Sequence, residues 1–437
     1  MAPRVLIIGA SVGGATAAIT LRGLGIETVM IEKELSKAKP CGGAVPPVAF
    51  REFDLPTHLI DRKVTHCLII SPSGQETNVP VAGSVPTDDD YVAMVRREVF
   101  DGYLRERAQE RGADLIHAQL TNLEVSSSGV RAHYRSMSDG SEHTIDADVV
   151  IGADGAYSPT SKLLGLPALP RAFAIQERIT LPASQMARWE DTAELYLGQE
   201  VSPDLYAWAF PKRDHIAIGI GAGPGHTQRT KELLINLKRR LGPALDGGRV
   251  MLREAHALPM KPRKQMAFDR AMLIGDAAGL VVHTSGEGIY WAMKSGQLAA
   301  QVLGQHLDAP TAQNLRAYER NWWKQYGTMY TFLEFLQWWG YGNERQMEVF
   351  TEMCRNPDVQ RLTFDSYMYK TMVPAPWAVQ MKMTWDIIRA QVRNYARRRT
   401  PLRRACAKSP SGPHPQPLSL TGRGEIPQQD ASGSPSP

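Results

Sequence analysis

Cysteine is scarce in this chain of 437 residues, which contains only Cys41, Cys67, Cys354 and Cys406 and no CxxC pair. That spacing excludes a disulfide framework and a zinc ribbon, and it favours a reducing compartment. The eleven histidines are scattered and form no HExxH pattern, so we expect no metal site. A P-loop is also missing, which argues against P-loop nucleotide hydrolases.

Long apolar runs are absent as well. No run reaches the roughly 18 residues that a membrane-spanning helix needs. The N-terminal VLIIGASVGGATAAI is interrupted by glycines and is followed by Glu27, Glu32 and Lys33. We therefore interpret it as a cytoplasmic strand, turn and helix and not as a secretion signal. With 43% hydrophobic and 22% charged residues, the composition excludes a wholly disordered chain and a polytopic membrane protein.

Acidic residues are missing from one segment. The net charge is +5, but residues 387–408 carry eight Lys or Arg and no acid, whereas residues 1–386 sum to −2. Such a patch can meet nucleic acid or anionic lipid. Because basic and aromatic residues are segregated and no nucleic-acid motif occurs, we expect no nucleic-acid partner. Residues 409–437 hold seven Pro, six Ser and four Gly and are predicted to be a disordered tail.

A glycine-rich turn opens the part of the sequence that carries chemistry. The first apolar strand runs into GASVGG at residues 9–14, and the next strand ends at Glu32. In a dinucleotide-binding βαβ unit of this spacing, Gly9 permits the tight turn and Gly14 permits close helix–strand contact, while the helix N-terminus faces a pyrophosphate. Ser11 replaces the middle glycine of GxGxxG. Glu32 is placed to accept hydrogen bonds from ribose hydroxyls, which disfavours a 2′-phosphate and favours FAD or NAD.

A second glycine-rich segment spans residues 273–303. Asp276 follows a short apolar strand, where its carboxylate can bind the polyol chain of a flavin. Gly286 and Gly288 then open a long helix, whose N-terminal dipole can stabilise the negative charge of a reduced flavin. Two such sites in this order resemble the glutathione-reductase-like FAD proteins. The predicted fold is α/β: a Rossmann-type FAD-binding domain of that kind, an antiparallel-sheet substrate domain and a helical C-terminal part.

Local patterns divide the chain further. Residues 206–210 and 216–220 alternate like half-buried strands and are expected to form a hairpin. Residues 92–112 have helical apolar spacing. The expected FAD-binding domain is discontinuous and consists of residues 1–57, 92–168 and 263–310. The expected substrate domain consists of residues 58–91 and 169–262, and the helical part of residues 311–408.

Several segments add a family resemblance. GDAAG…SGEGI…AMKSG, AKPCGGAVPP, YAWAFPK and TFDSYMYK resemble the geranylgeranyl reductase family, nearest to its chlorophyll and bacteriochlorophyll branch. The resemblance runs from Val5 to about residue 400. It implies an NADPH- and FAD-dependent oxidoreductase that reduces three double bonds of a geranylgeranyl chain, as the diphosphate or as a bacteriochlorophyllide ester, to phytyl. A flavin monooxygenase of the aromatic-hydroxylase type and a non-catalytic FAD-binding pigment-assembly protein are the alternatives.

The same resemblance assigns cofactor residues. The positions that match the family's FAD-binding positions are Gly9, Ser11, Gly14, Glu32, Arg97, Gly275, Asp276, Gly286 and Gly288. Asp154 is assigned with them because GADGAYSPTSK matches the D-G-x-x-S-x-x-R motif of flavin hydroxylases, although Ser161 replaces the arginine. This departure argues against a hydroxylase-like nicotinamide contact. No second βαβ fingerprint occurs, so NADPH is expected to bind transiently near the flavin.

Two segments are expected to carry the catalytic chemistry. The loop with Cys41 and Gly42 looks like one that approaches the isoalloxazine ring, where glycine lets the backbone come close. Tyr206, Trp208 and Phe210 share one strand face and are expected to line the substrate cavity. Reduction of an isolated alkene couples a hydride to a proton, and Cys41, Tyr206 or an ordered water is the candidate proton donor.

Aromatic side chains gather near the C-terminal part. Ten lie between Tyr318 and Tyr341, where they could wall an apolar tunnel or rest at a bilayer interface. The arginines from Arg393 to Arg404 could hold anionic lipid or a diphosphate. The alternative is a helical core followed by a solvated basic terminus. We therefore expect a polyprenyl substrate, peripheral contact with the cytoplasmic side of a photosynthetic membrane, and pigment-synthesis enzymes as partners there.

Overall fold

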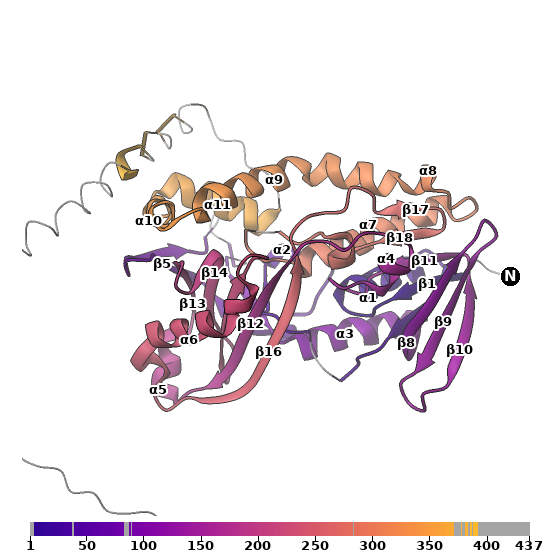
Figure 1. Ribbon diagram of the computed structural model, residues 1–437, viewed down its shortest axis with the longest axis horizontal. Coiled ribbons are helices and arrows are strands. Elements are labelled where there is room, and N and C mark those ends of the chain that lie inside the picture. The colour runs from indigo at the N-terminus through magenta and orange to yellow at the C-terminus, as the bar shows by residue number, and fades with distance from the viewer. Residues whose placement is uncertain are drawn as a thin grey trace, which may run out of the picture. The chain divides into compact units, whose positions relative to one another are not determined.

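The computed structural model describes residues 4–36, 39–82, 87–88, 90–282 and 284–370, together with 377, 381–382, 385–386 and 388–391. All of these belong to one unit, Met1–Asn394 (Figure 1). The tail at 409–437 and nearly all of the basic segment 387–408, including Arg393 and Arg404, lie outside the described residues.

The first of three sheets is built on parallel strands. Its order is β10-β9-β8-β2-β1-β11-β18-β17, with bounds β1 Arg4–Ile8, β2 Glu27–Glu32, β8 Asp114–Val125, β9 Val130–Ser136, β10 Glu142–Ala147, β11 Val149–Gly152, β17 Ala267–Phe268 and β18 Ala271–Leu273. Strand β1 pairs in parallel with both β2 and β11. Its alternate residues Leu6 and Ile8 pack against β8 and β9, whereas Val5 and Ile7 belong to the core under the helices. Burial of both faces explains the unbroken apolar run of β1.

Three helices cover the core face of this sheet: α1 Val12–Gly23, α3 Arg97–Glu110 and α7 Ile289–His306. A Cβ on Gly296 of α7 would lie 2.4 Å from the carbonyl oxygen of Gly13 in α1. The two helices therefore approach at backbone distance, and the pair brings the two glycine-rich segments of the sequence together.

The second sheet has the order β16-β12-β15-β14-β13-β5-β6. Its bounds are β5 His66–Ile70, β6 Glu76–Pro80, β12 Arg171–Thr180, β13 Thr192–Gly198, β14 Ser202–Pro211, β15 Ile216–Ala222 and β16 Arg249–Pro259. All neighbours are antiparallel except β13 and β5. The predicted hairpin is confirmed as β14 and β15. Leucines of α6, Thr230–Leu241, bury one face of this sheet, and its other face packs against Val64, Val92 and Met94 of the third sheet.

One local prediction is wrong. Residues 92–112 do not form one helix, because Val92–Val95 are strand β7 and the helix α3 starts at Arg97. Strand β7 pairs with β3, Ala44–Val45, and with β4, Ile60–Val64, in the third sheet. All of its residues are buried, and a short, fully buried apolar run has the same composition in a strand and in a helix.

The C-terminal part is helical, as expected. It contains α8 Ala312–Leu315, α9 Ala317–Tyr341, α10 Glu344–Met353 and α11 Pro357–Tyr369; shorter helices elsewhere are α2 Pro47–Glu52, α4 Pro159–Leu163 and α5 Ala183–Met186. Figure 1 shows α9 running beside α7. The aromatic segment is divided: Trp322, Tyr326 and Tyr330 are buried against Trp291 of α7, whereas Trp338 is 70% exposed. Among the described residues no helix is long and apolar enough to cross a membrane.

Candidate flavin and substrate site

The turn between β1 and α1 requires its glycines. Gly9 has a φ of +99°, and a Cβ there would lie 2.4 Å from the carbonyl oxygen of Ala153. A Cβ on Gly14 would lie 1.9 Å from the carbonyl oxygen of Gly9. The backbone amides at the start of α1 are thus held open for an anion at the helix N-terminus.

Ser11, which departs from the glycine pattern, belongs to a buried polar network. Its Oγ donates to Asp101 Oδ2 at 2.7 Å and accepts from Arg97 Nη2 at 2.9 Å. Arg97 and Asp101 are also joined by two 2.7 Å bonds. Burial disfavours the charged form of Arg97, but the charge and hydrogen bonds of Asp101 outweigh it, so the Arg97 pKa is raised. A charged guanidinium, paired with the Asp101 carboxylate, therefore lies beside the first turn of α1.

Glu32 closes the other side of the turn. Its Oε2 accepts from the amide of Ala10 at 2.7 Å, and its Oε1 accepts from the amide of Glu34 at 3.0 Å. The carboxylate thus lies at the carboxyl end of β2 and faces the glycine-rich turn. This is where a ribose-binding acid belongs in a dinucleotide fold.

Asp276 has two partners that sequence reasoning missed. Lys39 Nζ lies 2.6 Å from its Oδ2, and His256 Nε2 lies 3.8 Å from the same oxygen. Burial alone would raise the pKa of Asp276, but Lys39 and His256 overcome it and hold that pKa below its usual range. A Cβ on Gly288, the N-cap of α7, would lie 3.5 Å from Asp276 Oδ1. The carboxylate of Asp276 and the N-terminus of α7 therefore lie next to each other.

The two glycine-rich segments meet at Ala292 of α7. The Cβ that Gly275 lacks would be 3.0 Å from the Ala292 Cβ, and the Cβ that Gly13 lacks would be 3.0 Å from the Ala292 carbonyl oxygen. Gly275 and Gly286 also adopt positive φ values, +54° and +62°. The two segments, far apart in the sequence, are thus in contact in the structure, and their joint role in holding a flavin stays a prediction.

Asp154 and Ser161, in the segment that matches the hydroxylase motif, each have polar partners. Asp154 accepts from Ser158 Oγ at 2.6 Å and from the amide of Thr160 at 2.7 Å. Burial raises its pKa in spite of these bonds. Arg263, from a distant segment, donates to Ser161 Oγ at 3.0 Å. A guanidinium therefore reaches the place where the motif's own arginine is missing.

The loop of Cys41 and Gly42 is held against the second sheet. Gln176 Nε2 of β12 donates to the Cys41 carbonyl oxygen at 3.1 Å, and Lys212 Nζ donates to that of Gly42 at 2.8 Å. A Cβ on Gly42 would lie 2.7 Å from the ring of Phe210. The loop backbone therefore touches the strand face that was predicted to line the substrate cavity.

That strand face is an aromatic ladder on β14. The rings of Tyr206 and Trp208, and those of Trp208 and Phe210, have centroids 6.1 Å apart. Met368 of α11 packs against them. The Tyr206 hydroxyl donates to the Ser285 carbonyl oxygen, and burial raises its pKa far above the usual value. Tyr206 thus joins the ladder to the loop before α7.

Two buried polar atoms at this junction test whether a flavin fits. Among the described residues, Gln176 Oε1 and Trp208 Nε1 are buried without a hydrogen-bond partner. Buried polar atoms in proteins are nearly always paired. Both residues contact or border the Cys41–Gly42 loop. This unpaired acceptor and this unpaired donor, beside the Cys41–Gly42 loop, match the hydrogen-bonding edge of an isoalloxazine ring.

Known proteins match the chain over most of its length. A family model described as an FAD binding domain matches residues 3–322. The chain is 43% identical to a geranylgeranyl diphosphate reductase of Synechocystis over 91% of its own length and 99% of the relative. It is 33% identical to one of Rhodobacter capsulatus, over 84% and 91%. A geranylgeranyl bacteriochlorophyll reductase-like crystal structure from Thermoplasma acidophilum has a TM-score of 0.67 at 23% identity, over 90% and 97%.

The glycine-rich turns, the carboxylates beside the helix N-termini and the three-sheet architecture are those of an FAD-dependent oxidoreductase, and the matching FAD-binding model agrees. Within that class the chain belongs to the geranylgeranyl reductase family. The predicted family, fold class and flavin cofactor are thereby confirmed. The roles assigned to individual residues, Cys41 and Tyr206 among them, stay predictions.

Proposed function

We propose that this protein uses NADPH, through bound FAD, to reduce isolated double bonds of a geranylgeranyl chain to phytyl in (bacterio)chlorophyll biosynthesis. One observation carries the proposal. The backbone of Gly42, in the Cys41–Gly42 loop that we call the cofactor loop, lies directly against Phe210 of the aromatic ladder. The cofactor loop and an apolar wall are therefore in contact. The relatives named as geranylgeranyl diphosphate reductases support a prenyl chain as the occupant of that wall.

Each group of residues has a distinct task in this proposal. The N-terminus of α1 and the Arg97 cation hold the pyrophosphate, and Asp276 holds the polyol chain. When bound and reduced, FAD supplies a hydride to carbon. The N-terminus of α7 favours negative charge on the flavin's pyrimidine side. The ladder of Tyr206, Trp208 and Phe210 keeps water from the alkene.

NADPH is proposed as the hydride source for the flavin. Glu32 occupies the ribose end of the glycine-rich turn with a carboxylate, which repels a 2′-phosphate. We therefore propose that FAD takes this turn and that NADPH docks transiently elsewhere. The prenyl substrate carries either a diphosphate or a bacteriochlorophyllide ester at its polar end.

Peripheral membrane contact is part of the proposal. Phe335 and Trp338 on α9 are 54% and 70% exposed, and Trp377 and Trp385 are 73% and 55% exposed. The segment 387–408, with eight basic residues and no acid, follows directly in the chain. Aromatic side chains enter the bilayer interface and basic ones attract anionic lipid. We propose the cytoplasmic side of a photosynthetic membrane, where pigment-synthesis enzymes would meet the protein.

Anaerobic stopped-flow spectroscopy of the FAD-loaded protein tests this function. NADPH is expected to bleach the flavin absorbance, and geranylgeranyl diphosphate or its pigment ester is expected to restore it. Mass spectrometry of the prenyl product should then show two added hydrogens for every double bond reduced. Reoxidation by oxygen alone, with a hydroxylated product, would instead indicate a monooxygenase. A flavin that NADPH does not reduce would indicate a non-catalytic role.

A further inference from the structure

Lys212 is a buried cation at the end of the aromatic ladder. It follows directly after β14 in the chain, and its residue is only 3% exposed. Its Nζ donates to the carbonyl oxygen of Gly42, whose missing Cβ would touch Phe210. The ammonium therefore lies where the ladder meets the cofactor loop, next to both the proposed alkene site and the proposed flavin site.

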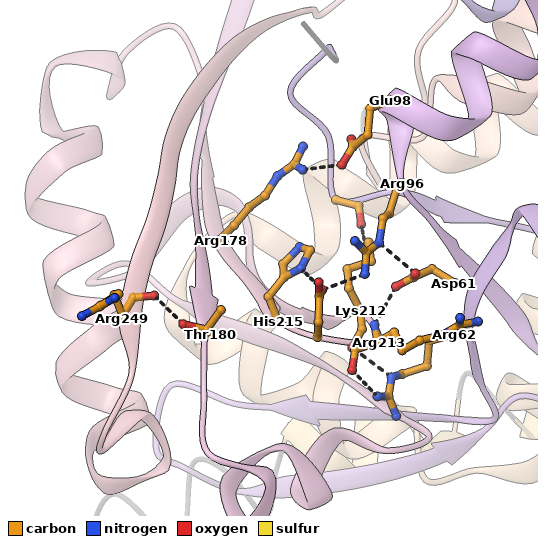
Figure 2. Close-up of polar contacts among 12 residues, drawn as sticks. Asp61, Arg62, Arg96, Glu98, Arg178, Thr180, Lys212, Arg213, His215 and Arg249 are labelled. Carbon is orange, nitrogen blue, oxygen red and sulfur yellow. Dashed lines mark hydrogen bonds and ion pairs between the residues drawn. The ribbon is translucent and has the colours of Figure 1, made fainter.

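The carboxylates around Lys212 are paired with arginines. Arg96 Nε lies 2.8 Å from Asp61 Oδ1, and Arg178 Nη1 lies 2.9 Å from Glu98 Oε1 (Figure 2). Among the described residues, no carboxylate lies within ion-pair distance of Lys212 Nζ. Burying a lysine without a counter-ion lowers the stability of the folded state, so we infer that Lys212 has a functional role.

Electrostatics at this position favour an exchangeable proton. Burial disfavours the ammonium and lowers the pKa of Lys212 to about 8, although the charges of Cys41 and Asp61 oppose it and those of Arg178 and Arg96 add to it. The charged or titratable groups that face Lys212 are Cys41 in the loop, Asp61 and Arg62 on β4, Arg96 before α3, Arg178 on β12 and His215 just before β15. A pKa near the working pH is what a general acid needs.

We propose that Lys212 is the proton donor that completes the reduction of each double bond. The inference rests on the proposed function, because it needs an alkene beside the ladder. One alkene carbon receives the hydride of the reduced flavin. The π electron pair then forms a C–H bond at the other carbon with a proton from Nζ. The N–H bond breaks, its electron pair stays on nitrogen, and Lys212 becomes a neutral amine.

The amine then regains a proton from water. His215 Nδ1 lies 2.7 Å from Asp214 Oδ1, and the Asp214 side chain is 55% exposed. These two residues connect the hairpin beside Lys212 to solvent. Each cycle would consume one nicotinamide hydride, passed on through the flavin, and one proton from water.

Tyr206, the donor candidate named from the sequence, is less suited to this step. Its hydroxyl proton is directed at the Ser285 carbonyl, and its pKa is raised far above neutrality by burial. An ammonium has three protons, so Lys212 keeps two others besides the one donated to the Gly42 carbonyl, and its pKa is lowered to about 8. Both residues come from the same YAWAFPK segment, and the structure favours its last residue as the acid.

Three variants test the inference by separating the two half-reactions. K212M removes the proton, K212R keeps the charge but holds its proton far more tightly, and R213M changes the neighbouring exposed residue of the same hairpin. In K212M and K212R, we expect NADPH to reduce the flavin normally. Reoxidation by the prenyl substrate should slow by about 10²- to 10⁴-fold, the usual contribution of a general acid. R213M should behave as wild type.

A second measurement follows the protonation of Lys212 Nζ directly, without catalytic turnover. In ¹⁵N-lysine-labelled holoprotein, the Nζ resonance that disappears in K212R should titrate near pH 8, and wild-type reoxidation should slow as the pH rises through that value. Wild-type rates in K212M, full activity in K212R, or a Lys212 that stays charged above pH 10 would each overturn the inference while leaving the proposed function intact. A wild-type flavin that no prenyl substrate reoxidises would overturn both.

Discussion

Glu287 and Lys370 form an ion pair, with Oε2 and Nζ 2.5 Å apart and side chains only 6% and 3% exposed. Lys370 follows α11 with a left-handed φ of +56°, and its Nζ lies 4.1 Å from the centre of the Tyr367 ring. Glu287 directly precedes Gly288, the N-cap of α7. The pair therefore links the end of α11 to the N-terminus of α7, which we assign to flavin binding.

Removing one member of this pair should be costly. K370M leaves the carboxylate of Glu287 buried and unpaired, which typically lowers the free energy of unfolding by 3–5 kcal/mol, so we expect about that loss. Urea unfolding of the FAD-loaded protein measures it. K382M is the matched control, because Lys382 pairs with Asp358 while 61% exposed, and it should cost no more than about 1 kcal/mol. Equal losses in the two variants would contradict the prediction.

Because of the ion pair of Lys39 and Asp276, the free energy of unfolding should fall at acidic pH. A carboxyl whose pKa is depressed in the folded state stabilises the fold above its unfolded pKa, which is about 3.9 for Asp, and that contribution is lost as the pH falls through the folded pKa. Because Lys39 and His256 hold the pKa of Asp276 below its usual range, we expect the wild type to lose stability below about pH 4.

K39M should weaken that pH dependence. Its unfolding free energy should already be lower at pH 7 and should change less on acidification, measured by urea unfolding from pH 7 to pH 3. K33M, at a neighbouring exposed lysine, is the control and should keep the wild-type profile. If the K39M and K33M curves ran parallel, the depressed pKa would have another cause.

Two glycines of α1 should respond in opposite directions to the same substitution. G14A places a Cβ 1.9 Å from the Gly9 carbonyl oxygen, a backbone atom that cannot move away alone, whereas a Cβ on Gly23 meets nothing within 4 Å. We expect G14A to abolish FAD retention and to lower the melting temperature. G23A should raise stability by about 0.5–1 kcal/mol, the usual gain of Ala over Gly in a helix. Flavin content and thermal unfolding measure both effects.

The FAD-binding fold could be predicted because its motif residues are close together in the sequence. Gly9, Gly14 and Glu32 each act within one βαβ unit, so their separation along the chain reports their separation in space. Lys39, Arg263 and Lys370 could not be found in this way. Each meets its partner across a long sequence separation, Asp276, Ser161 and Glu287 respectively, and no periodicity encodes such a contact.

The aromatic segment shows a second limit of sequence reasoning. One helix, α9, carries both Trp322, which is fully buried against Trp291, and Trp338, which is 70% exposed. Both ends of the helix are rich in aromatic residues, and only packing against other elements, such as that of Trp322 on Trp291 at the start of α7, distinguishes the covered rings. The tunnel or bilayer role expected for the whole segment therefore applies at most to its second half, while the first half is core.

The exposed half of α9 should bind lipid. Phe335 and Trp338 are 54% and 70% exposed with ring centroids 6.1 Å apart. Burying an aromatic side chain contributes about 1.5–3 kcal/mol, so F335S/W338S should weaken binding to vesicles containing anionic lipid by at least about tenfold. Its unfolding free energy should stay within about 0.5 kcal/mol of wild type, because both side chains face solvent.

Co-sedimentation with these vesicles at several salt concentrations measures the binding. L24S is the matched control, since Leu24 is 53% exposed beside α1 and lies on a different element. It should bind as wild type does. High salt should weaken binding of all three proteins, because it screens the basic segment 387–408, but it should not remove the difference between them. Equal vesicle affinity of wild type and F335S/W338S would mean that the exposed rings of α9 do not meet the membrane.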